Sequence, residues 1–211
     1  MYLSSIRLDE KRRKTLDALN NPGIVHGLVE RCFCQEEERA RRLWRIDRFG
    51  ETYRLLLLSE TIPDLSPIAS QLGFENDVGE TKDYTGLLNR IEAGQTWRFR
   101  IRANPVQSEK APGKTRGRIR AHVTVEQQKR WLMKCSERFG FALEYDQFDV
   151  VHTKWERFKK RIDDRRYVVF RTVTFEGSLR VTDGELFCNA LEGGIGREKG
   201  FGCGLLTIMR T

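Results

Sequence analysis

The order of expected strands and helices repeats once along the 211-residue chain, and this repeat constrains the fold more than any other feature. Asn21 followed by Pro22 predicts a helix start, because Asn can cap a helix and Pro is tolerated at its first position. The preceding segment, DEKRRKTLDALNNPG, reads as a polar connection. In the first half, hydrophobic periodicity predicts this helix from Pro22, another over 65–72, and strands over 2–8, 41–49, 51–59 and 84–91.

The second half shows the same order of strand, helix, strand, strand, helix, strand. It opens with TWRFRIRA, in which apolar residues alternate with arginines as in a half-buried strand. A loop rich in Pro, Gly and basic residues follows, NPVQSEKAPGKTRGR. The remaining elements are expected as a helix over 125–139, strand-rich stretches over 141–155 and 167–181, a helix over 183–191 and a strand over 201–209. The sequence therefore predicts an α+β fold with two tandem ferredoxin-like βαββαβ domains, 1–92 and 93–211.

The charge balance indicates an anionic partner. The net charge is +8 and the isoelectric point is near 9.4, which favours nucleic acid first and an anionic membrane surface second. The five cysteines form no C-x-x-C pair, so neither a zinc site nor a disulfide framework is expected, and a reducing cytoplasm fits best. No apolar stretch approaches the roughly 18 residues of a membrane span, so neither a secretory signal nor an anchor is expected.

Basic residues gather in two segments. Ten Lys or Arg stand against two acidic residues in 98–130, and eight against three in 154–171. The second segment lies at the expected tip of a hairpin, where it would form a positive finger able to reach structured RNA, although such a charge run is also typical of a solvated face. The RNA-binding candidates in these segments are Arg98, Arg100, Arg102, Lys110, Lys114, Arg116, Arg118, Arg157, Lys159, Lys160 and Arg161.

The stretch GGIGREKGFGCGLLTI, residues 193–208, contains six glycines around charged residues. It follows a helix and opens a strand, and its spacing differs from the G-x-G-x-x-G dinucleotide fingerprint and from the G-x-x-x-x-G-K-[ST] phosphate loop. Glycines allow backbone N–H groups to approach an anionic ligand, and basic side chains add charge. A flexible connection and a phosphate site of a small-ligand enzyme are the alternatives. The ligand-contact candidates here are Gly194, Gly196, Arg197, Lys199 and Gly200.

His26 differs from the other two histidines in its setting. At 100° per residue it falls beside Phe33 at the edge of the apolar stripe of its helix, where a side chain can be half exposed. Glu30, four residues on, shares its face. Spacing alone favours a boundary histidine paired with this carboxylate.

Several segments together resemble one known family. The start MYLSSIRL, the helix GIVHGLVERCF, the strand WRFRIRANPV, the segment VTFEGSLRVTD and the close GGIGREKGFGCGLLTIMR are similar to CasE, the CRISPR repeat-processing endoribonuclease subunit of the type I-E Cascade complex. The resemblance covers both halves. It implies two ferredoxin-like domains that bind a CRISPR repeat stem-loop, cut the precursor RNA at the 3′ base of the stem, and retain the product among other Cascade subunits.

The resemblance also implies a catalytic role for His26, because the family's catalytic histidine falls on this helix. The implied reaction is attack of a ribose 2′-OH on the adjacent phosphate, leaving a 2′,3′-cyclic phosphate, with no metal or other cofactor. Lys199 or Arg197 would stabilise the charge on the phosphate. Some members carry a tyrosine three residues before the histidine, where this chain has Gly23. A non-catalytic RNA-binding subunit of the same kind of assembly is the alternative function.

Overall fold

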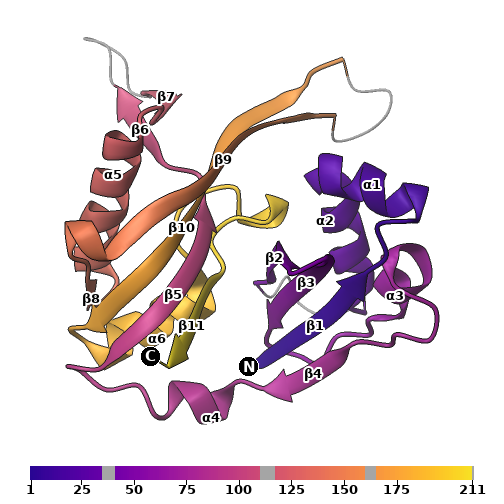
Figure 1. Ribbon diagram of the computed structural model, residues 1–211, viewed down its shortest axis with the longest axis horizontal. Coiled ribbons are helices and arrows are strands. Elements are labelled where there is room, and N and C mark those ends of the chain that lie inside the picture. Colours follow the sequence, from indigo (N-terminus) through magenta and orange to yellow (C-terminus); the bar gives the residue numbers. More distant parts are fainter. Residues whose placement is uncertain (35–40, 110–116, 160–164, 211) are drawn as a thin grey trace.

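The computed structural model describes residues 1–34, 41–109, 117–159 and 165–210, which form an α+β fold (Figure 1). The elements of the first half are β1 (Tyr2–Leu8), α1 (Arg13–Asn20), α2 (Pro22–Arg31), β2 (Leu43–Phe49), β3 (Thr52–Ser59), α3 (Ser66–Leu72), β4 (Glu80–Asp83) and α4 (Thr85–Leu88). Those of the second half are β5 (Thr96–Ala103), β6 (Val106–Glu109), β7 (Arg118–Ala121), α5 (Val125–Arg138), β8 (Phe141–Ala142), η1 (Tyr145–Gln147), β9 (Phe148–Phe158), β10 (Val168–Val181), α6 (Gly184–Gly193), η2 (Lys199–Phe201) and β11 (Leu206–Arg210).

The first half is built on an antiparallel sheet in the order β2-β3-β1-β4. Apolar residues of α2 and α3 pack against β1 and β3, because the helices and strands each carry one apolar face. This cluster includes Val25, Leu28 and Ile68 on the helices and Ile6 and Leu55 on the strands. The sheet order is that of a ferredoxin-like unit, as predicted.

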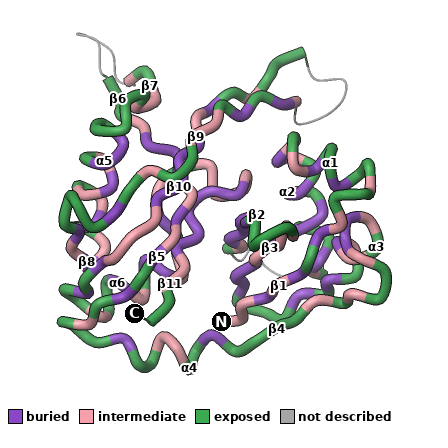
Figure 2. Tube along the Cα trace, in the orientation of Figure 1, coloured by how far each residue is buried: buried purple, intermediate pink, exposed green. Residues whose placement is uncertain are grey.

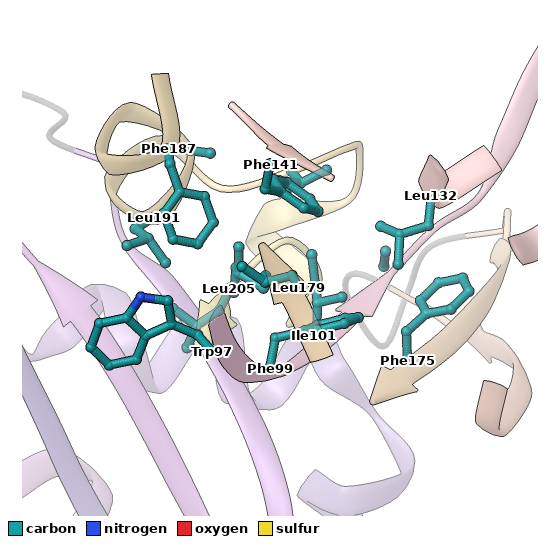
Figure 3. Close-up of a cluster of buried hydrophobic side chains, with 14 of the residues drawn as sticks. Trp97, Phe99, Ile101, Leu132, Phe141, Phe175, Leu179, Phe187, Leu191 and Leu205 are labelled. Atoms are coloured by element: carbon teal, nitrogen blue, oxygen red, sulfur yellow. The ribbon is translucent and has the colours of Figure 1, made fainter. Parts of the chain in front are cut away.

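The second half repeats this order in the sheet β11-β5-β10-β8, in which β9 also pairs with β10. Trp97, Phe99 and Ile101 are buried and face the core, which confirms the alternation predicted for this strand. Helix α5 begins with a capping box at Thr124 and contributes Leu132 to the same core. Figure 3 shows how these side chains and those of α6 converge on β5 and β10.

Three sequence expectations for individual elements are wrong. Residues 13–20 form α1 instead of a polar connection; the helix is short, buries only Thr15 and Ala18, and leaves most of its residues exposed. The strand expected over 84–91 lies earlier in the chain. Residues 80–83 form β4, which pairs with β1, and residues 85–88 form α4. All four β4 residues are exposed, so this edge strand carries no alternation. The last strand begins at Leu206 because residues 199–201 form the 3₁₀ turn η2.

The basic loop and the charged hairpin are partly described. The ends of the loop pair as β6 and β7, while Lys110, Lys114 and Arg116 lie outside the described residues. Strands β9 and β10 form the expected hairpin and project as a long arm over α1 and α2 (Figure 1). Lys160 and Arg161, predicted at its tip, also lie outside the described residues.

The two halves share buried contacts. Arg45 of β2 has 1% of its surface exposed, and its guanidinium donates to the carbonyls of Arg100 (2.9 Å) and Leu205 (2.7 Å) and to the hydroxyl of Thr207 (2.8 Å). Leu43 and Tyr84 belong to the same apolar cluster as the second-half core. The domain boundary between residues 92 and 93 stays a prediction. Among the described residues, no helix is long and apolar enough to cross a membrane.

Candidate active site

His26 lies in the second turn of α2. The helix begins as predicted: the side chain of Asn21 accepts a hydrogen bond from the Gly23 amide (2.9 Å), and Pro22 occupies the first turn. Val25 and Leu28 are buried against the sheet, while the His26 side chain is 42% exposed. The imidazole therefore stands at the boundary between core and surface, as its helical position predicts.

The glycine-rich connection between α6 and β11, residues 194–205, crosses to the first half and brings its backbone beside His26. A Cβ placed on Gly200 would lie 3.7 Å from both Cε1 and Nδ1 of the imidazole. The ring of Phe201 meets the imidazole edge-on, with centroids 5.7 Å apart. The indole of Trp44 donates to the carbonyl of Gly200 (3.2 Å) and anchors the turn on β2. His26 and the glycine-rich connection, 174 residues apart in sequence, thus form one site.

A carboxylate and a guanidinium support the imidazole from the helix side. Oε1 of Glu30 lies 3.9 Å from Nδ1 of His26, and its other oxygen accepts from Nη1 of Arg42 at 2.7 Å. Arg42 itself is 10% exposed and stacks over the ring of Phe33, 4.0 Å from its centroid. The position of the Glu30 carboxylate is therefore fixed by an arginine that is itself held in place.

Gly23 is the position at which some members of the resembled family carry a tyrosine. A Cβ on Gly23 would lie 3.3 Å from the ring of Phe158 and 3.0 Å from the Asn21 side chain. Phe158 packs edge-on against Phe201, with centroids 5.0 Å apart. An aromatic ring from the β9–β10 arm therefore occupies the space beside this position.

Two glycines of the glycine-rich connection are explained by how closely its backbone packs on the first half. Gly202 has φ +78°, and a Cβ there would lie 2.7 Å from the Trp44 ring. Gly194 has φ +69° and is buried against Leu43, so its backbone is covered by β2. These glycines let the connection lie flat on the first half, whereas Gly196, Arg197 and Gly200 keep some exposure.

The side chain of Lys199 is hydrogen-bonded at the end of α6. Its ammonium donates to the carbonyl of Gly193 (2.7 Å) at the end of α6. Burial, with a smaller contribution from the charge of Arg41, lowers the pKa of Lys199 below its ordinary value. The catalytic role predicted for Lys199 stays a prediction, and it would require this hydrogen bond to be exchanged for one to the phosphate.

The three arginines of β5 differ in their surroundings. Arg98 is exposed. Arg100 pairs with Asp47 (3.0 Å) and also with Glu176, and Arg102 pairs with Glu156 (2.6 Å). Arg100 and Arg102 line a cleft of about 730 Å³ between the halves. Their predicted contact with RNA would have to compete with these carboxylates.

The other described basic candidates lie at the periphery. Arg118 is exposed on β7, which lies on the opposite side of the molecule from α2 (Figure 1). Arg157 and Lys159 lie on the β9–β10 arm, near the ring of Tyr167. Their contact with RNA stays a prediction. Within the part of the chain that the structure describes, no group of three or more His, Cys, Asp or Glu side chains is arranged to hold a metal ion.

Comparison with known proteins settles the family. The model of a family described as CRISPR associated protein matches residues 1–210. The chain belongs to this family. The CRISPR-associated endoribonuclease Cse3 of Thermus thermophilus is 29% identical over 219 residues, covering 99% of both proteins. The predicted similarity to the CasE family is confirmed.

Solved structures agree over the whole chain. A Cse3 endoribonuclease bound to a 19-nucleotide RNA has a TM-score of 0.80 and 25% identity, covering 99% of this chain and all of the other. Thermus thermophilus Cse3 bound to an RNA that represents a pre-cleavage complex has a TM-score of 0.79 and 27% identity, covering 99% and 98%. Cas6e of Escherichia coli, at 19% identity and a TM-score of 0.61, shares the fold.

Several residues around His26 are not evident from the sequence. Phe158, Phe201 and Trp44 reach the site from three separate elements, and Arg42 reaches it through Glu30. Phe158 could have been recognised as a buried position of an alternating strand, whereas Trp44 lies between two other buried residues of β2, Leu43 and Arg45. Their proximity to His26 depends on how the two halves pack, which no local pattern reports.

Proposed function

We propose that the protein is an endoribonuclease that binds CRISPR repeat stem-loops in precursor CRISPR RNA and cleaves at the 3′ base of the stem. The observation that carries this proposal is the His26 imidazole, half exposed beside the backbone of Gly200, in a chain similar along its whole length to Cse3. The pre-cleavage RNA complex of Thermus thermophilus Cse3 supports the substrate class.

In the proposed reaction, a ribose 2′-OH attacks the adjacent phosphorus and the 5′-oxygen leaves. One proton moves from the 2′-OH and one moves to the leaving oxygen, so the products carry a 2′,3′-cyclic phosphate and a 5′-OH. His26 takes the first proton or gives the second, a task suited to an imidazole near neutral pH. Nδ1 is the ring nitrogen beside Glu30, which leaves Nε2 for the substrate.

Charge on the phosphate is stabilised by groups of the glycine-rich connection. Backbone N–H groups near Gly196 and Gly200, with the side chains of Arg197 and Lys199, are the proposed donors. Because proton transfer and charge stabilisation both come from the protein, cleavage is proposed to need no metal or other cofactor. The product is proposed to stay bound and to join other Cascade subunits in the cytoplasm.

The test is cleavage of a labelled repeat stem-loop in EDTA by the wild type and by His26→Ala. We expect the wild type to leave a cyclic phosphate, and the variant to lose about 10²–10⁴-fold in rate while it still binds RNA. Tight binding with no cleavage by either protein would instead indicate a non-catalytic RNA-binding subunit. Loss of cleavage in EDTA that Mg²⁺ restores would contradict metal independence.

A further inference from the structure

The β9–β10 arm has two faces of opposite character. Cross-strand partners in an antiparallel pair share a face, and successive residues alternate between faces. Phe158 and Phe170 lie on the inner face, where both are buried and pack against Phe201 of the active site. Figure 2 shows buried and exposed residues alternating along the arm. The inner face therefore accounts for the docking of the arm on the glycine-rich connection.

The outer face carries aromatic and apolar side chains that the fold leaves exposed. Trp155 is 51% exposed, Tyr167 is 49% and Val169 is 55%. Trp155 pairs across the strands with Arg171, and Val169 pairs with Arg157. We call these five residues the outer arm face. Exposed aromatic rings gathered on one surface are typical of a binding site.

Guanidinium groups lie beside both rings. The Arg171 guanidinium carbon is 5.5 Å from the centroid of the Trp155 ring, and that of Arg157 is 4.2 Å from the Tyr167 ring. Alternation of arginines with aromatic rings suits a ligand that is both planar and anionic, because rings stack on bases while cations pair with phosphates. This chemistry favours nucleic acid over an apolar protein surface.

The rings also discriminate between paired and unpaired RNA. The bases of an A-form stem are stacked on one another and its deep groove is too narrow for side-chain readout, whereas unpaired bases can stack on aromatic side chains. We propose that the outer arm face binds unpaired nucleotides that flank the repeat stem, by stacking bases on Trp155 and Tyr167 and pairing phosphates with Arg157 and Arg171. This proposal rests on the proposed function, from which the RNA substrate comes.

The position of the arm suits contact with unpaired RNA that flanks the stem. Phe158, on the reverse of the same two strands, contacts Phe201, whose ring lies 5.7 Å from that of His26. An RNA strand that leaves the His26 site therefore reaches the outer arm face by passing the edge of the arm. The stem itself need not change position for this contact.

The test measures binding of Trp155→Ala to two RNAs that carry a 2′-deoxy nucleotide at the cleavage site. One is the bare repeat stem-loop, and the other is the same stem-loop extended by unpaired nucleotides on each side. We expect Trp155→Ala to weaken binding of the extended RNA about 10-fold and to leave binding of the bare stem-loop unchanged. Trp155→Phe, which keeps a ring, should retain most of the affinity.

Phe49→Ala removes an exposed aromatic ring on the first half and serves as the matched control, for which no change is expected. An equal loss on both RNAs would show that Trp155 contacts the stem and would overturn the proposal. No loss on either RNA, with reduced assembly into the Cascade complex, would identify a protein-binding surface and would also overturn it. Failure of the proposed function is distinguishable, because it appears as RNA binding with no cleavage by either the wild type or His26→Ala.

Discussion

The carboxylate of Glu30 joins two side chains of the active site, with His26 Nδ1 at 3.9 Å and Arg42 Nη1 at 2.7 Å. A carboxylate beside one ring nitrogen favours the tautomer in which that nitrogen carries the proton. We expect Glu30→Ala to lower the single-turnover cleavage rate about 10-fold, part of the 10²–10⁴-fold that general acid–base catalysis contributes, without weakening RNA binding. Quench-flow cleavage and a binding titration on the same RNA measure the two effects.

A direct readout of this contact is the ¹⁵N spectrum of the His26 ring. In the wild type the proton should reside on Nδ1, facing Glu30, and Glu30→Ala should redistribute it between the two nitrogens. Glu51→Ala removes an exposed carboxylate that pairs with Arg48 and should change neither the spectrum nor the rate. An unchanged ring spectrum in Glu30→Ala would show that Glu30 does not orient the imidazole.

At the scale of elements, we expect two glycines of the glycine-rich connection to differ in role: Gly202 contributes to folding stability, and Gly200 contributes to catalysis. An alanine at position 202 would have to adopt φ +78°, and its Cβ would lie 2.7 Å from the Trp44 ring. The Cβ of an alanine at position 200 would lie 3.7 Å from the His26 ring, an ordinary van der Waals distance. We expect Gly202→Ala to lower the free energy of unfolding by about 1–3 kcal/mol. Gly200→Ala should keep its stability and reduce cleavage, because the added methyl group would occupy space beside the imidazole that the RNA substrate needs. Urea denaturation and single-turnover cleavage test the pair, and equal stability losses would contradict this division.

Elements with a strong pattern were predictable, and those held by tertiary contacts were not. The alternation in β5 and the cap of α2 predicted two elements correctly, and the helix expected over 125–139 agrees with α5. Strand β4 exists because β1 offers it a free edge, so its own residues carry no signal. The glycine-rich connection was recognisable as unusual from composition, but Trp44, which explains Gly202, lies 158 residues away.

On the scale of the whole molecule, the site exists because the two halves dock. His26 comes from the first half and Gly200 from the second, so the sequence could nominate each residue but not bring them together. Arg45 holds the halves in register, since it donates to the carbonyl of Leu205, the last residue of the glycine-rich connection. Burial lowers the pKa of the Arg45 guanidinium, and the adjacent Asp47 opposes this shift by stabilising its charge.

Asp47 therefore keeps a buried charge compensated, and its removal should be more damaging than removal of the whole ion pair. We expect Asp47→Ala to lower the free energy of unfolding by about 3–5 kcal/mol, because Arg45 would remain buried without its carboxylate. Arg45→Met combined with Asp47→Leu should restore much of that loss, since it replaces both charges with apolar side chains. Urea denaturation of the two variants compares them directly. A double variant less stable than Asp47→Ala would show that the hydrogen bonds of Arg45 to the second half, and not compensation of its charge, hold the two halves together.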